Sequence, residues 1–429
     1  MELTLVNVIA DIEKVAKENN IEPSEMTISQ YSKYGGHFDG RLLRKIGGFQ
    51  AIINEAYRDQ IHCDFNTKQY LDRRRNYVNK LERQLGDWNY LLREFEHSWT
   101  RVFNEVGPVY VSKLTKPSLP KAYNKERQNV AFVSDLHLGL RIDPEEVGSN
   151  KYNWQVAARR LGKYAEQVAT YKIVHRDECP ILRLCLGGDL GQGVIHPDYG
   201  TDEITRQCYG IYLYLASMID YWRHHYQRIE VEFTPDNHMR MPHRGPDRNF
   251  TQKYDSFATI GILLPLQAAF RGMDDVVFHP TKSGISTFDV LGHKFGMTHG
   301  DTHIYAGNVG KSVDVKNIAN EILKLNAAQV DHRPYDAMLL GHVHTPLFMY
   351  LNEADTFLII NGSGSGSDGY AVSQGFFQGR PHQIILESTV QYPVGDLRMV
   401  ALDDADNEPR YEKIVPVYKY GLEIPKTTK

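Results

Sequence analysis

Five apolar runs in the sequence each end in residues that can bind a metal ion, and this repetition constrains the fold more than any other feature. The first run covers residues 130–139 and leads into Asp135-x-His137. A continuous apolar run is typical of a buried strand in a parallel sheet. Two residues apart on an extended chain, a carboxylate and an imidazole point to the same side. The run therefore predicts the start of a metal site at a strand end.

The later runs have the same form, and their metal-capable residues are, in chain order, Asp189, Asn237 with His238, His299, and His342 with His344. Open α/β sheets place ligand sites outside the carboxyl ends of their strands. A single histidine of this kind is more often a loop or core residue whose hydrogen bonds are made within the protein. Five in series, each directly after an apolar run, are hard to obtain by chance. The sequence therefore predicts an α/β fold with a metal site at one edge of the sheet.

The ordered set D-x-H, G-D, N-H, H-G and G-H-x-H resembles the signature of the calcineurin-like metallophosphoesterases, over residues 129–402. The segment after Asp189, the Asn237-His238-x-Arg240 motif and the run NGSGSGSDGY are similar to the DNA-repair nuclease branch and to phage-type enzymes. The resemblance implies a four-layer α/β/β/α sandwich. Here a small helical domain and a long helix would precede it.

The resemblance also implies a site for two divalent ions. One ion would be held by Asp135, His137, Asp189 and His344, and the other by Asp189, Asn237, His299 and His342. Asp189 would bridge the ions, His238 would face the leaving group, and Arg240 would contact the phosphate. Carboxylate, amide and imidazole donors together suit borderline ions, so we expect manganese, with iron or zinc as alternatives. Such a pair acidifies a bridging water and holds the phosphoryl oxygens.

Two positions depart from the family pattern. The residue before Asn237 is usually glycine and here is Asp236, and the residue after His238 is often acidic and here is Met239. We therefore expect the carboxylate partner of His238 to come from another position, with Asp135, Asp236 and Asp301 as candidates. The run at residues 362–369, GSGSGSDG, is open to three interpretations: a lid, a phosphate-facing nest or a plain connector.

Residues 1–62 predict a small helical module. Apolar spacing predicts a helix over residues 3–19, and Thr27 is a good N-cap for a second helix that stops at Gly35-Gly36. Residues 27–57 resemble the repeat attached to some homing endonucleases, which is associated with DNA binding. Its basic residues, in the place of a recognition helix, are Arg41, Arg44 and Lys45. We expect these to contact DNA; the alternative is a docking module with solvated basic residues.

Residues 63–127 predict a long helix and a linker. Apolar residues alternate in steps of three and four from Val78 to Val102, which is a heptad pattern. This seam, within residues 71–103, predicts either a homodimer contact or packing against the neighbouring domain. Three prolines mark the linker after it. The predicted domains are therefore 1–62, 63–127, a catalytic domain at 128–403 and a tail at 404–429.

Composition and charge indicate the cellular compartment of the protein and what its site needs in order to hold an anionic substrate. The 429 residues have a net charge of −4, with basic residues in excess up to residue 127 and acidic residues in excess after it. An acidic catalytic part needs cations to hold an anionic substrate. The sequence has no apolar stretch long enough to span a membrane and no signal peptide, and its four cysteines form no C-x-x-C pair. We expect a cytoplasmic protein of a bacterium or a phage-infected cell.

These features together predict a dinuclear-metal phosphodiesterase that hydrolyses nucleic acid, with a DNA nuclease of phage or DNA-repair type as the leading hypothesis. Two alternatives remain open. One is a phosphoesterase for cyclic nucleotides or phosphoproteins, which would use the same site. The other is a DNA-binding scaffold with a weak hydrolase half.

Overall fold

The computed structural model describes residues 5–38, 43, 49, 52–53, 93, 95, 97, 99, 111, 126–148, 150–173, 179–194, 202–240, 256–281, 283–307, 313–369, 372 and 379–418. The chain divides into two compact units, Met1–His97 and Ser98–Lys429. Each unit is described by itself.

The first unit contains α1 (Leu5–Glu18), the 3-10 turn η1 (Pro23–Glu25) and α2 (Ile28–Lys33). Both helices were predicted. Thr27 is the N-cap of α2 and forms a reciprocal capping box with Gln30, which satisfies amides at the helix start. Apolar residues of α1 and α2 share a buried core with helical residues further along: Leu43, Phe49, Ile52 and Ile53. Arg41, Arg44 and Lys45 lie outside the described residues.

The second unit contains two mixed sheets. The first has the strand order β11-β10-β1-β2-β3-β4. Its strands are β1 (Arg127–Val133), β2 (Ile181–Leu186), β3 (Arg228–Phe233), β4 (Val276–His279), β10 (His382–Thr389) and β11 (Asp396–Ala401). Neighbouring pairs among β1 to β4 are parallel, and β10 pairs with β1 in the antiparallel sense. The carboxyl ends of β1, β2 and β3 therefore lie at one edge.

The second sheet has the order β5-β6-β7-β9-β8. Its strands are β5 (Ser286–Val290), β6 (His293–Thr298), β7 (Ala337–Leu340), β8 (Leu347–Leu351) and β9 (Thr356–Ile360). The central strands β6, β7 and β9 are parallel. Each of the five apolar runs is a strand, as predicted, and each strand ends just before its metal-capable residues.

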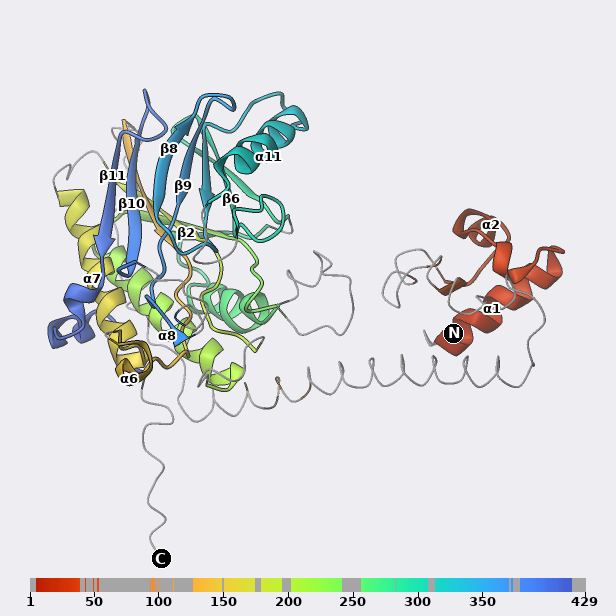
Figure 1. The fold of residues 1–429 in the computed structure, drawn as a ribbon, viewed down its shortest axis with the longest axis horizontal. Coiled ribbons are helices and arrows are strands. Elements are labelled where there is room, and N and C mark those ends of the chain that lie inside the picture. Colours follow the sequence, from red (N-terminus) through yellow and green to blue (C-terminus); the bar gives the residue numbers. More distant parts are fainter. Residues whose placement is uncertain are drawn as a thin grey trace, which may run out of the picture. The chain divides into compact units, whose positions relative to one another are not determined.

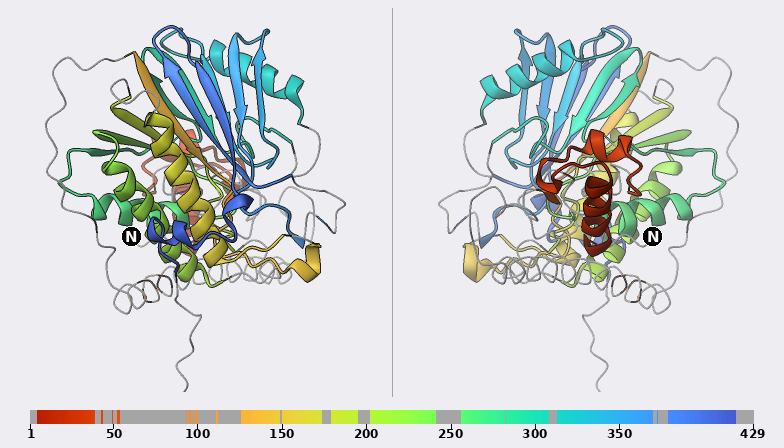
Figure 2. Two further views of the ribbon diagram at one scale, coloured as in Figure 1. Left: turned by 90° about the vertical axis from the view of Figure 1, so that its left-hand side faces the viewer. Right: turned by 90° about the vertical axis from the view of Figure 1, so that its right-hand side faces the viewer.

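The two sheets pack face to face with helices outside them (Figure 1). Apolar side chains of β1, β2 and β10 meet those of β5, β6, β7 and β9 in one buried core. On the far side of the second sheet, α11 (Val315–Ala327) packs Ile318 and Ile322 against β7 and β9. The long helices α7 (Trp154–Ile173) and α8 (Ile204–Arg223) cover the first sheet, and α7 lies across its strands in Figure 2. This is the four-layer α/β/β/α arrangement.

Shorter elements complete the unit. They are α6 (Pro144–Val147), the π-helical turn η2 (Thr259–Leu263), α10 (Leu264–Ala269) and the 3-10 turns η3 (Asp403–Ala405) and η4 (Pro409–Lys413). The segment after β11, which we expected to be a tail, packs against α7 as far as residue 418. Tyr411, Val415 and Tyr418 are buried there. Apolar burial therefore joins this segment to the rest of the second unit.

Most of the heptad seam lies outside the described residues, so its dimer contact stays a prediction. Of its residues, Phe95 is buried, and the Trp99 ring lies 6.2 Å from the Tyr209 ring of α8. Among the described residues, no helix combines the length and the apolar character needed to cross a membrane.

Candidate metal centre

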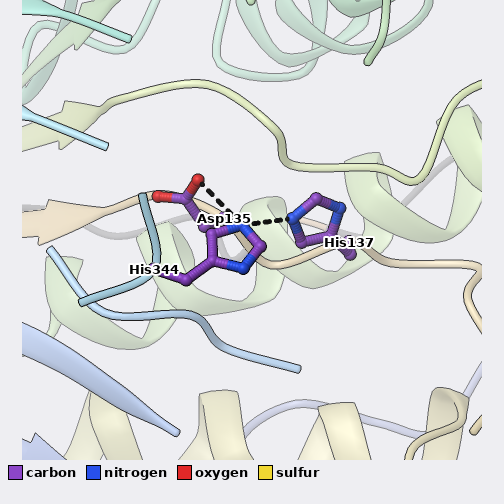
Figure 3. A group of neighbouring side chains, drawn as sticks. All are labelled: Asp135, His137 and His344. Carbon is purple, nitrogen blue, oxygen red and sulfur yellow. Dashed lines mark hydrogen bonds and ion pairs between the residues drawn. The ribbon is translucent and has the colours of Figure 1, made fainter. Parts of the chain in front are cut away.

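The first group of site residues comes from β1 and from the loop after β7. Asp135 and His137 follow β1, and His344 follows β7; all three side chains are buried. The Nε2 atoms of His137 and His344 face each other at 3.0 Å, and His344 Nε2 lies 3.5 Å from Asp135 Oδ1 (Figure 3). Three potential ligand atoms thus converge on one point, although Asp135 and His344 are far apart in the sequence.

The second group comes from β2, β6 and the same loop after β7. His299 Nε2 lies 3.0 Å from Asp189 Oδ2, and the rings of His299 and His342 meet edge to face at 5.2 Å. Asp189, His299 and His342 have ligand atoms within one ion's reach of each other. Asp189 also lies within reach of His137. Its position between the two groups is the one that a bridging carboxylate requires.

Unpaired buried atoms show that these residues fit a metal ion. Asn237 Oδ1 and His342 Nδ1 are buried and make no hydrogen bond within the described part of the chain. Leaving such an atom buried without a partner costs about 1–3 kcal/mol, so a concentration of them needs an explanation. A cation accepts lone pairs from oxygen and imidazole nitrogen and would satisfy them. Donors of these types favour manganese, iron or zinc over magnesium and calcium.

The backbone of the site is held in an uncommon conformation. Five site residues have a positive φ: Asp135, His137, Asp189, His342 and His344. For residues other than glycine this left-handed region is sparsely populated, and such conformations cluster at functional sites. Only nine non-glycine residues in the described structure share it, so more than half of the strained positions belong to this site. The chain turns sharply here in order to aim these side chains inward.

Gly188 lets two strands approach at the site. Its φ is +91°, and a Cβ at this position would lie 2.7 Å from Cβ of Asp236 and 2.8 Å from Nδ1 of His299. Any side chain would push the β2 and β6 loops apart. The Gly-Gly-Asp pattern is therefore required by the packing around Asp189.

Burial and the neighbouring imidazoles set the charges of the two carboxylates. Burial alone would raise the pKa of Asp135, but the hydrogen bond and charge of His344 outweigh it and lower that pKa. Burial likewise opposes the charge of Asp189, and His238 and His299 hold its pKa well below the usual value. Both carboxylates are therefore ionised at neutral pH, as metal ligands must be.

The histidines divide into neutral and charged rings. Burial lowers the pKa of His137 to about 3 and that of His342 to about 4, with neighbouring imidazoles adding to the effect. Burial also opposes the charge of His299, but Asp189 outweighs it and raises the pKa of His299 to about 10. A neutral ring offers its lone pair at once, whereas His299 must first lose a proton.

His238 is oriented by a main-chain carbonyl. Its Nδ1 lies 2.9 Å from the carbonyl oxygen of Gln192, which can only accept, so Nδ1 donates. Its Nε2 then faces the site, 3.8 Å from Asp189 Oδ2. Asp236 has a different role from the one considered for it: its two oxygens accept the main-chain N–H groups of Asp189 and Met239. It shapes the loop, and burial followed by the charge of Asp189 raises its pKa to about 6.

Arg240 follows His238 by two residues and is half-buried. It stands at the end of the same loop, so its role as a phosphate contact stays a prediction. The structure describes none of the three basic residues predicted to contact DNA.

The glycine-serine run at residues 362–369 is largely buried and tied to the first group of site residues. Gly364 N donates to the Asp135 carbonyl at 2.8 Å. The buried side chain of Arg160 on α7 donates to the carbonyls of Gly364 and Ser365, and also binds Asp406. Of the three interpretations, the connector fits best, because buried main-chain bonds oppose the opening of a lid. Arg160 could not be singled out from the sequence, since a lone arginine on a helix is typical of a solvated face.

The described unit is thus a two-sheet α/β sandwich with a cluster of carboxylate and imidazole side chains where the strands end. Solved structures that resemble it include a zinc-bound Vps29 from Entamoeba histolytica, at 12% identity and a TM-score of 0.28 over 63% of this chain and 97% of that one. An archaeal phosphodiesterase matches at 13% identity and a TM-score of 0.30, over 64% and 99%. A hypothetical protein from Pyrococcus horikoshii matches at 9% identity and a TM-score of 0.32, over 67% and 94%.

No family model matches the chain, and no curated protein matches it. The solved structures are distant, so the functional argument rests on the site itself.

Proposed function

We propose that the chain is a phosphodiesterase that uses two divalent metal ions and hydrolyses nucleic acid, as a DNA nuclease. The observation that carries this proposal is the convergence of the Asp135 group and the Asp189 group, which are joined by the approach of His137 to Asp189. Two ionised carboxylates and the neutral rings of His137 and His342 bury several lone pairs in one place, which is costly unless a cation accepts them. The ordered motif set carried by these residues resembles that of metallophosphoesterases.

In this proposal, His137 and His344 with Asp135 would hold one ion, and Asn237, His299 and His342 the other, with Asp189 between them. When bound, such ions supply an acidified water and neutralise charge on the phosphoryl oxygens. Manganese is the ion we propose.

The chain's own residues would position the phosphodiester and handle the proton. His238 keeps Nδ1–H on the Gln192 carbonyl, so in its imidazolium form it would deliver the Nε2 proton to the leaving oxygen and become neutral. Arg240 would bind a non-bridging oxygen through its fixed fork of donors. Asp236 holds the loop that carries Asn237 and His238 by accepting the main-chain N–H groups of Asp189 and Met239.

The DNA part of the proposal is supported by the N-terminal module. Its fold begins with the two helices that the sequence predicted, and the resemblance to a DNA-associated repeat covers residues 27–57. Arg41, Arg44 and Lys45 would contact the DNA backbone. Phosphate contacts of this kind are screened by salt, so a triple alanine variant should bind DNA with a shallower salt dependence.

The test is hydrolysis of three substrates with manganese: linear DNA, single-stranded DNA and bis-p-nitrophenyl phosphate. Cleavage of DNA supports the proposal. Hydrolysis of the small ester without cleavage of DNA favours a small-molecule phosphoesterase, and DNA binding without any hydrolysis favours a scaffold. A chain that neither hydrolyses these substrates nor retains manganese contradicts the proposal.

A further inference from the structure

Gln192 contacts both His137 and His238, whose rings are neighbours beside the predicted metal site. Its side chain is buried, and its Oε1 lies 3.0 Å from Nδ1 of His137. Its main-chain oxygen lies 2.9 Å from Nδ1 of His238. One residue therefore contacts both rings, through a side-chain amide in one case and a peptide carbonyl in the other.

The position of Gln192 is fixed by its neighbour Gly193. The backbone of Gly193 has a φ of +68°, and a Cβ there would lie 1.8 Å from the main-chain oxygen of His238. The buried side chain of Gln207 on α8 holds Gly193 from both sides, accepting from its N–H at 2.8 Å and donating to its carbonyl at 3.0 Å. The loop is thus anchored to a long helix and packed directly against the His238 backbone.

The two contacts determine which nitrogen of each ring faces the site. A peptide carbonyl can only accept, so His238 donates from Nδ1 and presents Nε2. Nε2 of His137 faces Nε2 of His344 at 3.0 Å, which is where a metal ligand needs its lone pair. His137 must then carry its proton on Nδ1, and Gln192 accepts it at Oε1. The rings of His137 and His238 meet edge to face at 4.7 Å, so both are held in one arrangement.

We propose that Gln192 is a positioning residue for both histidines: its side chain fixes His137 as a metal ligand, and its carbonyl fixes His238 as the proton donor. This inference rests on the proposed function and deepens it. A ring whose second nitrogen is hydrogen-bonded is oriented and held in one tautomer. Because the amide is uncharged, it does this without adding charge to the site.

Two substitutions, Gln192→Met and Gln192→Glu, test whether the site needs the hydrogen-bond acceptor of Gln192 or only the volume of its side chain. Methionine fills a similar space but cannot accept the Nδ1–H of His137. Loss of such a contact typically weakens metal binding by about 10–100-fold, and we expect that loss for manganese, measured by competition with a chelator. Glutamate keeps an acceptor, so Gln192→Glu should bind manganese at least as tightly as the parent. Gln128→Met is the control, because Gln128 is also buried but lies at the start of β1, away from the site.

A second measurement needs no metal. In the metal-free full chain with 15N-labelled histidine, His137 should give the signals of a ring protonated at Nδ1, assigned by their loss in His137→Ala. Gln192→Met should shift these signals, while those of His238 keep their Nδ1–H pattern because the peptide carbonyl remains. Gln192→Glu should retain the parental pattern for both rings.

The outcomes are distinct. If the parent chain binds manganese and Gln192→Met binds it equally well, the positioning role is wrong. It is also wrong if Gln128→Met weakens binding as much, because the effect would then be general destabilisation. If the parent chain binds no manganese, the proposed function fails, and the metal-free spectra still decide whether Gln192 sets the His137 tautomer. A ring protonated at Nε2 in the parent would overturn the inference.

Discussion

A buried carboxylate binds an imidazole in each unit of the chain, but the two pairs differ in what surrounds them. In the N-terminal unit, Asp11 accepts from Nδ1 of His37 at 2.6 Å, from the His37 main-chain N–H at 2.9 Å and from the Tyr31 hydroxyl. In the second unit, Asp189 faces His299 at 3.0 Å within a group of buried ligand atoms that lack partners. The first carboxylate is satisfied by its own neighbours, whereas the second lies in a site that is incomplete without a cation.

The two carboxylate–imidazole pairs also differ in the conformation of their backbone. Asp11 lies within helix α1 and His37 in an ordinary turn, whereas Asp189 and four other site residues have a positive φ. A pair that only crosslinks two segments needs no strained backbone. Unpaired acceptors together with strained backbone thus distinguish the carboxylate–imidazole pair of the proposed metal site from the pair in the N-terminal unit.

The largest effect should come from exchanging the bridging carboxylate. Asp189→Asn removes the charge shared by both groups, so we expect loss of both manganese ions and of hydrolysis, measured by metal analysis and by ester turnover. The matched control is Asp11→Asn, which alters the other buried pair and should leave metal content and turnover unchanged. Normal manganese content in Asp189→Asn would contradict the proposal that the Asp189 pair, unlike the Asp11 pair, binds metal.

The second effect concerns His238. His238→Ala removes the proton donor but no proposed ligand, so we expect kcat to fall by about 100–10,000-fold while manganese content stays at the parental level. The control variant is His37→Ala, which removes the imidazole that binds Asp11 in the N-terminal unit. Parental turnover in His238→Ala would contradict the role given to this ring.

The pH dependence of metal binding should follow His299. Its pKa is raised from 6.5 to about 10 by Asp189, so in the metal-free protein the ring keeps its proton through neutral pH. The ion pair therefore contributes to stability fully below pH 6.5 and is lost as the pH rises through about 10. A metal ion needs the neutral ring, so binding releases this proton and affinity should rise by about tenfold per pH unit between pH 7 and 9.

Calorimetry in buffers of different ionisation enthalpy measures this proton release directly. Release of at least about one proton per chain at pH 8 agrees with the account, because Asp135 also raises the pKa of His344, which must lose its proton to bind the ion. Binding with no release, and with an affinity that does not change with pH, would mean that His299 is not a ligand.

The smallest effect should be confined to the N-terminal unit. Asp11→Ala leaves the Tyr31 hydroxyl and the His37 N–H without their buried acceptor, which costs about 1–3 kcal/mol. Hydrogen exchange of the full chain should show faster exchange in α1 and α2 and unchanged protection in β1 and β2. Slower hydrolysis of bis-p-nitrophenyl phosphate by Asp11→Ala would show that Asp11 affects the proposed metal site. It would contradict the view that the Asp11 pair is only structural.

The parts of the fold that follow from side-chain pattern could be predicted from the sequence. Apolar runs gave the strands β1, β2, β3, β6 and β7, and the residues directly after each run are the ones that the structure brings together. This works because a buried strand needs continuous apolar residues and because parallel strands end at a common edge.

The parts that depend on main-chain atoms could not be predicted. His238 is held by the carbonyl of Gln192, and a peptide carbonyl leaves no mark on the identity of a residue. Asp236 looked like a partner for His238, but its oxygens bind main-chain N–H groups across the β2 and β3 loops. The buried Arg160 was missed for a similar reason, since half of its hydrogen bonds go to main-chain carbonyls. Spacing along the chain does not report these contacts.

The central claim is that the Asp135 group and the Asp189 group enclose two metal ions, and anomalous scattering from crystals soaked in manganese tests it most directly. The account predicts two peaks, one beside His137 and His344 and one beside His299 and His342, with Asp189 between them. The absence of any peak among these side chains would contradict it.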